Sequence, residues 1–249
     1  MVSGKYSALS GAISREQRLA NISANLANVN TIGYKKNSMT FESILKGEQQ
    51  TSKASGVNYT RIQNNYTDFT EGPIKQTGNP LDIAIHDEGF FKIQAGAEFR
   101  YTRRGDFHTD STGILLTGNN MPVLDEANSV ITIPQNGTAR ISVNSLGEIS
   151  VLSLEGGRDI VGKIGIFTIN DTKLLKRETD TLFSLEKGGL EVPVEAPTLA
   201  VEHLEIANIN MTEEMARMID SMRTFESYQK VIKAYSQLGQ KQDELGTLG

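Results

Sequence analysis

Amphipathic helical sequence occurs at both ends of the chain and nowhere between them, which restricts the folds open to it. From about Tyr6 to Val29, apolar residues recur at steps of three and four, which places them on one face of a helix. Polar Arg15, Glu16 and Arg18 occupy the other face. The first apolar stripe consists of Leu9, Ala12, Ile13, Leu19, Ile22, Leu26 and Val29.

The second helical segment begins near residue 210 and carries a longer stripe. Asn210 followed three residues later by Glu213 is typical of a capping box, with Thr212 as an alternative cap. Four of the seven methionines lie on this stripe, which favours an adaptable helix–helix seam. The second stripe consists of Met211, Met215, Met218, Met222, Phe225, Tyr228, Val231, Tyr235 and Leu238.

Residues 66–209 contain short β-forming runs separated by turn sequences at 110–113, 136–137 and 144–147. Because no helical crossover separates these runs, they predict an antiparallel β domain. Residues 47–65 are polar and typical of a linker or extended arm. The predicted strands lie at 81–85, 89–93, 99–101, 130–133, 140–143, 149–151 and 163–167.

Each apolar stripe needs a partner, and the nearest candidate for each is the other stripe. We therefore expect an α+β fold in which the long N- and C-terminal helices pair as a coiled-coil-like domain, with a mainly antiparallel β domain inserted between them. The expected domains are 1–36 with 205–249, an arm or linker at 37–65, and a β domain at 66–204. In the alternative, each helix packs on the β domain as ordinary core.

The composition excludes several kinds of site. The chain has no Cys, so disulfides, Cys-ligated zinc and thiol nucleophiles are excluded, and it has only three His. A net charge of −5 argues against general nucleic-acid binding. The hydrophobic fraction is 38%, below the usual ~45–50%, which favours a core completed by partner molecules.

The sequence shows neither the apolar run of a membrane span nor the pattern of a secretory signal. No apolar run approaches the ~18–20 residues that span a bilayer, so we expect no direct membrane insertion. Ser, Arg and Glu interrupt every candidate for the 7–15-residue apolar region of a secretory signal near the N-terminus. We expect any export to use a route without a cleaved signal peptide.

Two short constellations invite a chemical interpretation. His86 and Asp87 are adjacent, so on a strand they point to opposite faces. Asp106, His108 and Asp110 alternate and would share a strand face suited to a metal, but the segment runs into a turn where Asp favours local backbone hydrogen bonds. Nucleotide-binding and nucleophile-elbow motifs do not follow any predicted strand. We predict no catalytic, cofactor-binding or metal site, and no enzymatic activity.

Asparagine is unusually dense at the end of the first helix, with four between Asn21 and Asn30. Asparagine lowers helix stability, so this density needs a reason. We expect Asn25 and Asn28 to hydrogen-bond across a helix–helix interface and fix its register. Asn30, Thr31 and Gly33 are expected to end the helix and turn the chain.

The same segment carries a family resemblance. ANLANVNTIGYKK at residues 24–36 resembles the N-terminal signature of the bacterial flagellar basal-body rod and hook family. Further stretches that resemble this family are QTGNPLDIAI at 76–85, GFFKIQ at 89–94, YTRRGDF at 101–107 and LEIANIN at 204–210. The resemblance is weakest at 47–65 and 150–200.

The resemblance implies an axial, non-enzymatic subunit that polymerises into a hollow helical rod crossing the periplasm and transmits motor torque. It implies partners that are copies of the chain itself, other flagellar rod subunits and the flagellar type III export apparatus, through which such subunits pass unfolded. Proximal rod subunits are the most similar, and distal rod subunits are the alternative. A secreted adhesin-like β protein is the alternative of another class.

A polymer and helix interface follows from combining the two stripes with the asparagine-rich segment. We expect its residues to contact either the partner helix or a neighbouring subunit. They are Leu9, Ile13, Leu19, Ile22, Asn25, Leu26, Asn28, Val29, Asn30, Thr31, Gly33, Met211, Met215, Met218, Met222, Phe225, Tyr228, Val231 and Tyr235.

Overall fold

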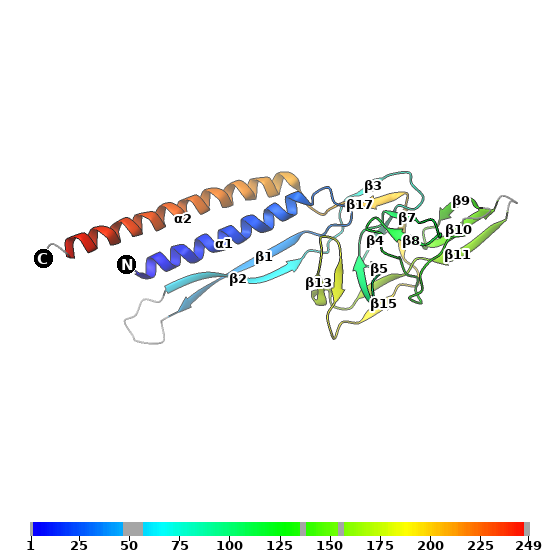
Figure 1. Cartoon of the computed structure of the whole chain (residues 1–249), viewed down its shortest axis with the longest axis horizontal. Coiled ribbons are helices and arrows are strands. Elements are labelled where there is room, and N and C mark those ends of the chain that lie inside the picture. The colour runs from blue at the N-terminus through cyan, green and yellow to red at the C-terminus, as the bar shows by residue number, and fades with distance from the viewer. Residues whose placement is uncertain (1, 47–56, 135–137, 154–156, 247–249) are drawn as a thin grey trace. The chain divides into compact units, whose positions relative to one another are not determined.

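The computed structural model describes residues 2–46, 57–134, 138–153 and 157–246 (Figure 1). The chain forms two compact units. One comprises residues 1–27, 37–66 and 210–249, and the other comprises 28–36 and 67–209. We call them the helical unit and the β unit.

The helical unit contains helix α1 (Val2–Ala27), helix α2 (Met211–Gly246) and the paired strands β1 (Asn37–Lys46) and β2 (Val57–Thr67). The two helices lie side by side and run in opposite directions (Figure 1). The start of α2 is as predicted, because the Asn210 Oδ1 atom accepts hydrogen bonds from the backbone N–H groups of Thr212 at 3.1 Å and Glu213 at 3.3 Å. The Glu213 side chain binds Arg217 at 2.5 Å.

The β unit is built from antiparallel strand pairs. A six-stranded sheet has the order β13-β14-β6-β5-β12-β15, and a three-stranded sheet has the order β11-β10-β9. The remaining pairs are β16-β4, β17-β3 and β7-β8. The first strands are β3 (Ile74–Gln76), β4 (Ile83–His86), β5 (Phe90–Ala95), β6 (Glu98–Thr102), β7 (Phe107–Thr109), β8 (Leu115–Thr117), β9 (Thr138–Val143) and β10 (Glu148–Ser153). They are followed by β11 (Arg158–Lys163), β12 (Ile166–Ile169), the 3₁₀ turn η1 (Thr172–Leu174), β13 (Leu175–Arg177), β14 (Phe183–Leu185), β15 (Glu191–Pro193), β16 (Thr198–Val201) and β17 (His203–Glu205).

Strand β5 divides the apolar core of the β unit into two clusters. Neighbouring residues of a strand point to opposite faces, and Phe90 and Phe91 accordingly belong to different clusters. Phe91 and Ile93 lie in the larger cluster, which also contains Leu115. Phe90 lies in a smaller aromatic cluster, where its ring meets that of Phe183 edge-on at 6.4 Å between centroids. Both faces of this strand are therefore buried.

The expected fold of a coiled-coil-like domain with an inserted β domain is wrong. The structure has one N-terminal and one C-terminal helix, 38% strand and 28% helix. The helical unit also includes strands β1 and β2, and residues 28–36 fold with the β unit. The helix contact is not the apolar seam of a coiled coil, because much of each predicted stripe faces solvent while glycine and tyrosine residues form the contact.

The described parts of 37–65, which the sequence predicts as an arm or linker, lie in the paired strands β1 and β2. The centre of that segment, 47–56, lies outside the described residues. Of the two helices in the described part of the chain, neither is long and apolar enough to cross a membrane.

Candidate assembly surface

The contact between the helices pairs glycines with tyrosine rings. A Cβ atom at Gly4 would lie 2.6 Å from the Tyr235 hydroxyl oxygen, and one at Gly11 would lie 2.5 Å from the Tyr228 ring. Gly4 and Gly11 are seven residues apart, as are Tyr228 and Tyr235, so each pair lies on one face of its helix. The two rings therefore pack where no side chain larger than hydrogen fits on α1.

The predicted stripe residues divide by exposure. Ile22 is 3% exposed, whereas Leu9 is 42% and Ile13 46% exposed on the same helix. Leu19, Leu26, Met218, Phe225, Tyr228 and Tyr235 are half-buried. Exposed side chains of this size in a row are typical of an interaction surface. The exposed apolar residues of the helical unit are Tyr6, Leu9, Ile13, Tyr66, Met211, Met215, Ile219, Met222, Val231 and Leu238.

Asn25 is fully buried and bonds to a strand. Its Nδ2 atom donates to the Asn37 carbonyl oxygen at 2.9 Å, and its Oδ1 atom accepts from the Asn37 N–H at 3.0 Å. The side chain thus completes the backbone pairing at the start of β1, a role that spacing on a helix does not reveal.

The residues after α1 belong to the β unit and turn the chain. The Thr31 hydroxyl donates to Asn28 Oδ1 at 3.0 Å, and Asn28 Nδ2 donates to Asp180 at 3.4 Å. Gly33 has a φ of +68°, and a Cβ atom there would lie 2.4 Å from the backbone nitrogen of Arg104. Only glycine fits at this position. Val29 and Thr31 are half-buried, and Asn30 is exposed.

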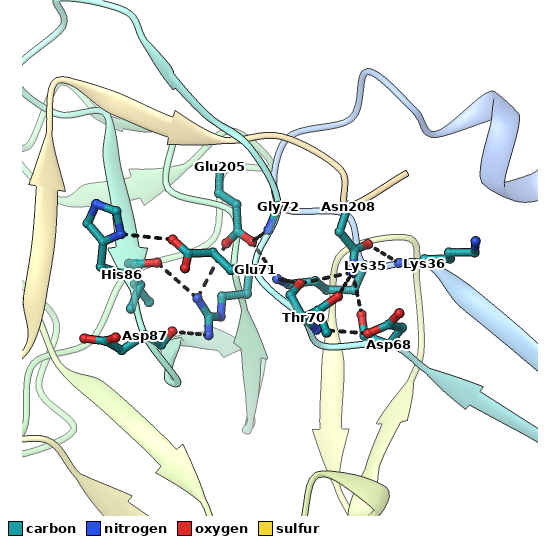
Figure 2. Close-up of polar contacts among 12 residues, drawn as sticks. Lys35, Lys36, Asp68, Thr70, Glu71, Gly72, His86, Asp87, Glu205 and Asn208 are labelled. Carbon is teal, nitrogen blue, oxygen red and sulfur yellow. Dashed lines mark hydrogen bonds and ion pairs between the residues drawn. The ribbon is translucent and has the colours of Figure 1, made fainter. Parts of the chain in front are cut away.

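A buried charged cluster joins four segments of the β unit (Figure 2). The Lys35 Nζ atom lies 2.5 Å from Glu205 Oε1 and donates to the Thr70 carbonyl at 2.7 Å. The Gly72 N–H donates to the same Glu205 oxygen at 2.8 Å. Arg103 lies 3.5 Å from the other Glu205 oxygen. One carboxylate therefore faces two cations in a site that excludes water.

Burial decides the electrostatics of this cluster. It lowers the pKa of Lys35, although the Glu205 charge acts in the opposite direction. Burial also lowers the pKa of the Arg103 guanidinium, again against the Glu205 charge. The buried charges are thus stabilised by one another and by their hydrogen bonds, and not by water.

Asn208 ties three of these segments together beside the ion pair (Figure 2). Its Oδ1 atom accepts from the Lys36 N–H at 2.7 Å. Its Nδ2 atom donates to the carbonyls of Asp68 at 2.9 Å and Thr70 at 3.0 Å. The segments 33–36, 68–72 and 205–208 each adjoin a point where the chain passes between the two units. We call the cluster with Asn208 the junction cluster. The motifs that resemble the family contain Lys35 and Asn208, but their spacing in the sequence does not predict that both belong to one cluster.

The possible metal constellation has other partners. Asp106 binds Arg104 at 2.5 Å, and the His108 ring contacts Asn120 at 3.1 Å. Hydrogen bonds from Thr112 lower the pKa of Asp110, which caps its own turn. Among the described residues, no group of three or more His, Asp and Glu side chains is placed to hold a metal ion.

Three family models match the chain. Residues 6–35 match the flagella basal body rod protein model, residues 84–151 match the D1 domain of flagellar hook protein FlgE/F/G, and residues 201–245 match the C-terminal model of flagellar basal body rod FlgEFG protein. The first and last of these cover most of α1 and α2, and the middle one lies within the β unit.

Curated relatives match over nearly the whole chain. The flagellar basal-body rod protein FlgG of Bacillus subtilis is 32% identical, over 97% of this chain and 98% of its own length. The FlgF rod protein of Caulobacter vibrioides is 30% identical over 94% and 93%. The hook-basal body complex protein FlhO of Bacillus subtilis is 27% identical over the full length of both. The chain therefore belongs to the flagellar basal-body rod protein family.

Proposed function

We propose that this protein is an axial subunit of the flagellar basal body that polymerises into the hollow helical rod and transmits torque, with its place in the proximal rod. The relatives are structural rod proteins, which supports a structural role in the basal body. The observation that carries polymerisation is the set of apolar side chains that α1 and α2 leave exposed. Burial of these apolar side chains against neighbouring subunits lowers the free energy of the assembled state relative to the isolated subunit.

The distal rod is the alternative position. Relatives named FlgG and FlgF match at 32% and 30% identity over most of the chain, so both positions have support. The proximal position rests on DFTEGP at 68–73 before QTG at 76–78, and on RTFESYQK at 223–230, which most resemble proximal rod subunits. Other rod subunits and the flagellar type III export apparatus are the proposed partners, and the periplasmic part of the rod is the proposed location.

Deletion of the coding gene tests the proposal. We expect cells without the protein to lack swimming and an assembled hook, and a plasmid copy to restore both. A peptide tag on the restored copy, located by electron cryomicroscopy of purified basal bodies, gives the position along the rod. Normal swimming of the deletion strain contradicts the function, and a tag at the hook end of the rod selects the distal position.

A further inference from the structure

The helical unit contains a cavity of about 150 Å³ beside the helix contact. Gly11 and Tyr228 form one side of it, Phe41 and Thr60 from the strand pair form another, and Arg15 and Arg18 line it from α1. A cavity of this size admits a benzene-sized apolar group. The cavity therefore has room for one apolar side chain.

The charges around the cavity specify a second property of its occupant. Within the ranges that the structure describes, neither Arg15 nor Arg18 has a carboxylate or other hydrogen-bond partner. Guanidinium groups prefer carboxylates and bind them through two parallel hydrogen bonds. The surface thus fits an apolar side chain that has a carboxylate within one helical turn.

Helix α2 carries that combination on an exposed face. Met211, Met215, Ile219 and Met222 are about half exposed, and Glu226 follows Met222 by one turn. At about 100° per residue these five positions fall within an arc of roughly 80°. Glu226 is exposed and has no ion-pair partner in the described part of the chain. An unbranched methionine adapts well to an irregular cavity.

A second exposed face competes for the same cavity. Tyr6, Leu9 and Ile13 on α1 are followed by Glu16, but Lys5 lies at the other end of that row. On α2, Arg223 and Lys230 lie about 60° and 40° around the helix from Glu226, so each face carries one carboxylate and at least one cation. Charge therefore does not separate the two faces. The methionines of α2 adapt to an irregular cavity better than the tyrosine and β-branched isoleucine of the α1 row, which favours the α2 face.

We propose that α2 of a second copy of this chain docks at the cavity, with its Met222 side chain inside and its Glu226 carboxylate at Arg15 and Arg18. The α2 face lies about 100–180° around the helix from Tyr228, so the donor and acceptor surfaces of one chain are different. Contacts between different surfaces are head-to-tail and need not close. This inference rests on the proposed rod function, and it names the contact that propagates the polymer.

Cross-linking of the full chain tests the contact. The chain has no Cys, so a Thr60→Cys chain and a Met222→Cys chain carry one thiol each. The Thr60 backbone keeps its bonds with Ser10 and Ser14 in the first variant. With different tags on the two chains, a short bis-maleimide should give a cross-linked dimer that contains one of each.

Two matched controls decide the assignment. Gln17→Cys lies on the outer face of α1, and its mixture with Met222→Cys should give no such dimer. A Thr60→Cys mixture with Ile13→Cys tests the competing α1 face. A dimer with Ile13→Cys and none with Met222→Cys overturns the proposal, and equal yields from Gln17→Cys and Thr60→Cys do so as well.

Charge reversal gives an independent test in cells and in the same assay. Arg18→Glu and Glu226→Lys should each lower the yield of the mixed dimer at least about tenfold, and the double variant should restore it. The double variant Arg18→Glu with Glu16→Lys is the control: it restores the net charge of the chain but not the pairing with Glu226, so its dimer yield should stay low. If deletion of the gene leaves swimming intact, the rod function fails whatever the cross-links show. If deletion stops swimming but both single reversals swim and cross-link normally, only the contact fails.

Discussion

Lys35 and Glu205 form a fully buried ion pair with 2.5 Å between Nζ and Oε1, although 170 residues separate them in the sequence. The pair sits beside Asn208, whose amide binds the backbone at Lys36, Asp68 and Thr70. Three of the four passages of the chain between its two units, at 36/37, 66/67 and 209/210, therefore lie next to one set of buried polar contacts.

Removal of the shared carboxylate should destabilise the β unit strongly. In Glu205→Gln, Lys35 and Arg103 remain buried and lose the buried carboxylate that they share, which should lower the free energy of unfolding by about 3–5 kcal/mol. Denaturant unfolding followed by circular dichroism measures the change. Glu98→Gln is the matched control, because Glu98 pairs with Arg100 at an exposed position and should cost less than about 1 kcal/mol. Equal effects of the two changes contradict the role of the buried pair.

Tyr101 should resist ionisation in the folded protein. Burial, reinforced by the hydrogen bond to Glu191, raises its pKa well above the ordinary value of 10. From about pH 10 upward the folded chain then binds more protons than the unfolded chain, so stability falls as pH rises through that range. Spectrophotometric titration of the seven tyrosines should show one fewer late-ionising group in Tyr101→Phe. An unchanged late fraction in that variant is the opposing result.

The glycine–tyrosine contact should not tolerate a side chain at Gly11. Gly11→Val forces the Tyr228 ring away from α1, which should cost about 1–3 kcal/mol of helical-unit stability. Gly239 is also in a helix, but a Cβ atom there would have nothing within 4 Å, so Gly239→Ala should stabilise by about 0.5–1 kcal/mol. Thermal unfolding at 222 nm distinguishes the two. A Gly11→Val protein as stable as the parent would mean that the rings do not pack there.

The exposed face of α2 should matter for assembly and not for folding. Met222 is 48% exposed, so Met222→Asp should leave the unfolding midpoint unchanged while it blocks incorporation into the rod. Leu26 is half-buried, so Leu26→Asp should lower both the stability and the incorporation. Swimming assays and subunit content of purified basal bodies provide the readout. Normal swimming of the Met222→Asp strain counts against the face.

The terminal helices should exchange their amide hydrogens faster in the isolated subunit than in the assembled rod. Their apolar rows face solvent, and helices gain most of their stability from packing of such rows. We expect the exchange of residues 6–29 and 211–238 to slow on assembly, as hydrogen-exchange mass spectrometry of both states can show. Equal protection of these segments in the monomer and in the rod refutes this expectation.

Sequence periodicity predicted where the helices lie and where α2 begins, because caps and apolar spacing are local signals. On α2 the predicted stripe includes Tyr228 and Tyr235, which form the contact, but on α1 the stripe did not indicate the contacting glycines. The apolar count favoured Leu9 and Ile13, whereas the contact uses Gly4 and Gly11, which have no apolar side chain to count. The seven-residue spacing of Gly4 and Gly11, matched by Tyr228 and Tyr235, was the available signal.

The junction cluster lay beyond sequence reasoning for a different reason. Lys35 looks like a surface residue, and its burial depends on Glu205 and on backbone oxygens contributed by distant segments. Asn25 similarly pairs with the backbone of Asn37 rather than with another helix. Long-range polar partners are chosen by the tertiary fold and leave no periodic trace.

Because Gly4 and Tyr235 lie at opposite ends of the chain, their contact can form only late in synthesis. A ribosome that adds about 5–20 residues per second incorporates Tyr235 roughly ten seconds or more after Gly4. Throughout that interval α1 exists without its tyrosine partners. Any cellular factor that recognises the nascent N-terminal segment acts on it before competition from its own C-terminal helix can begin.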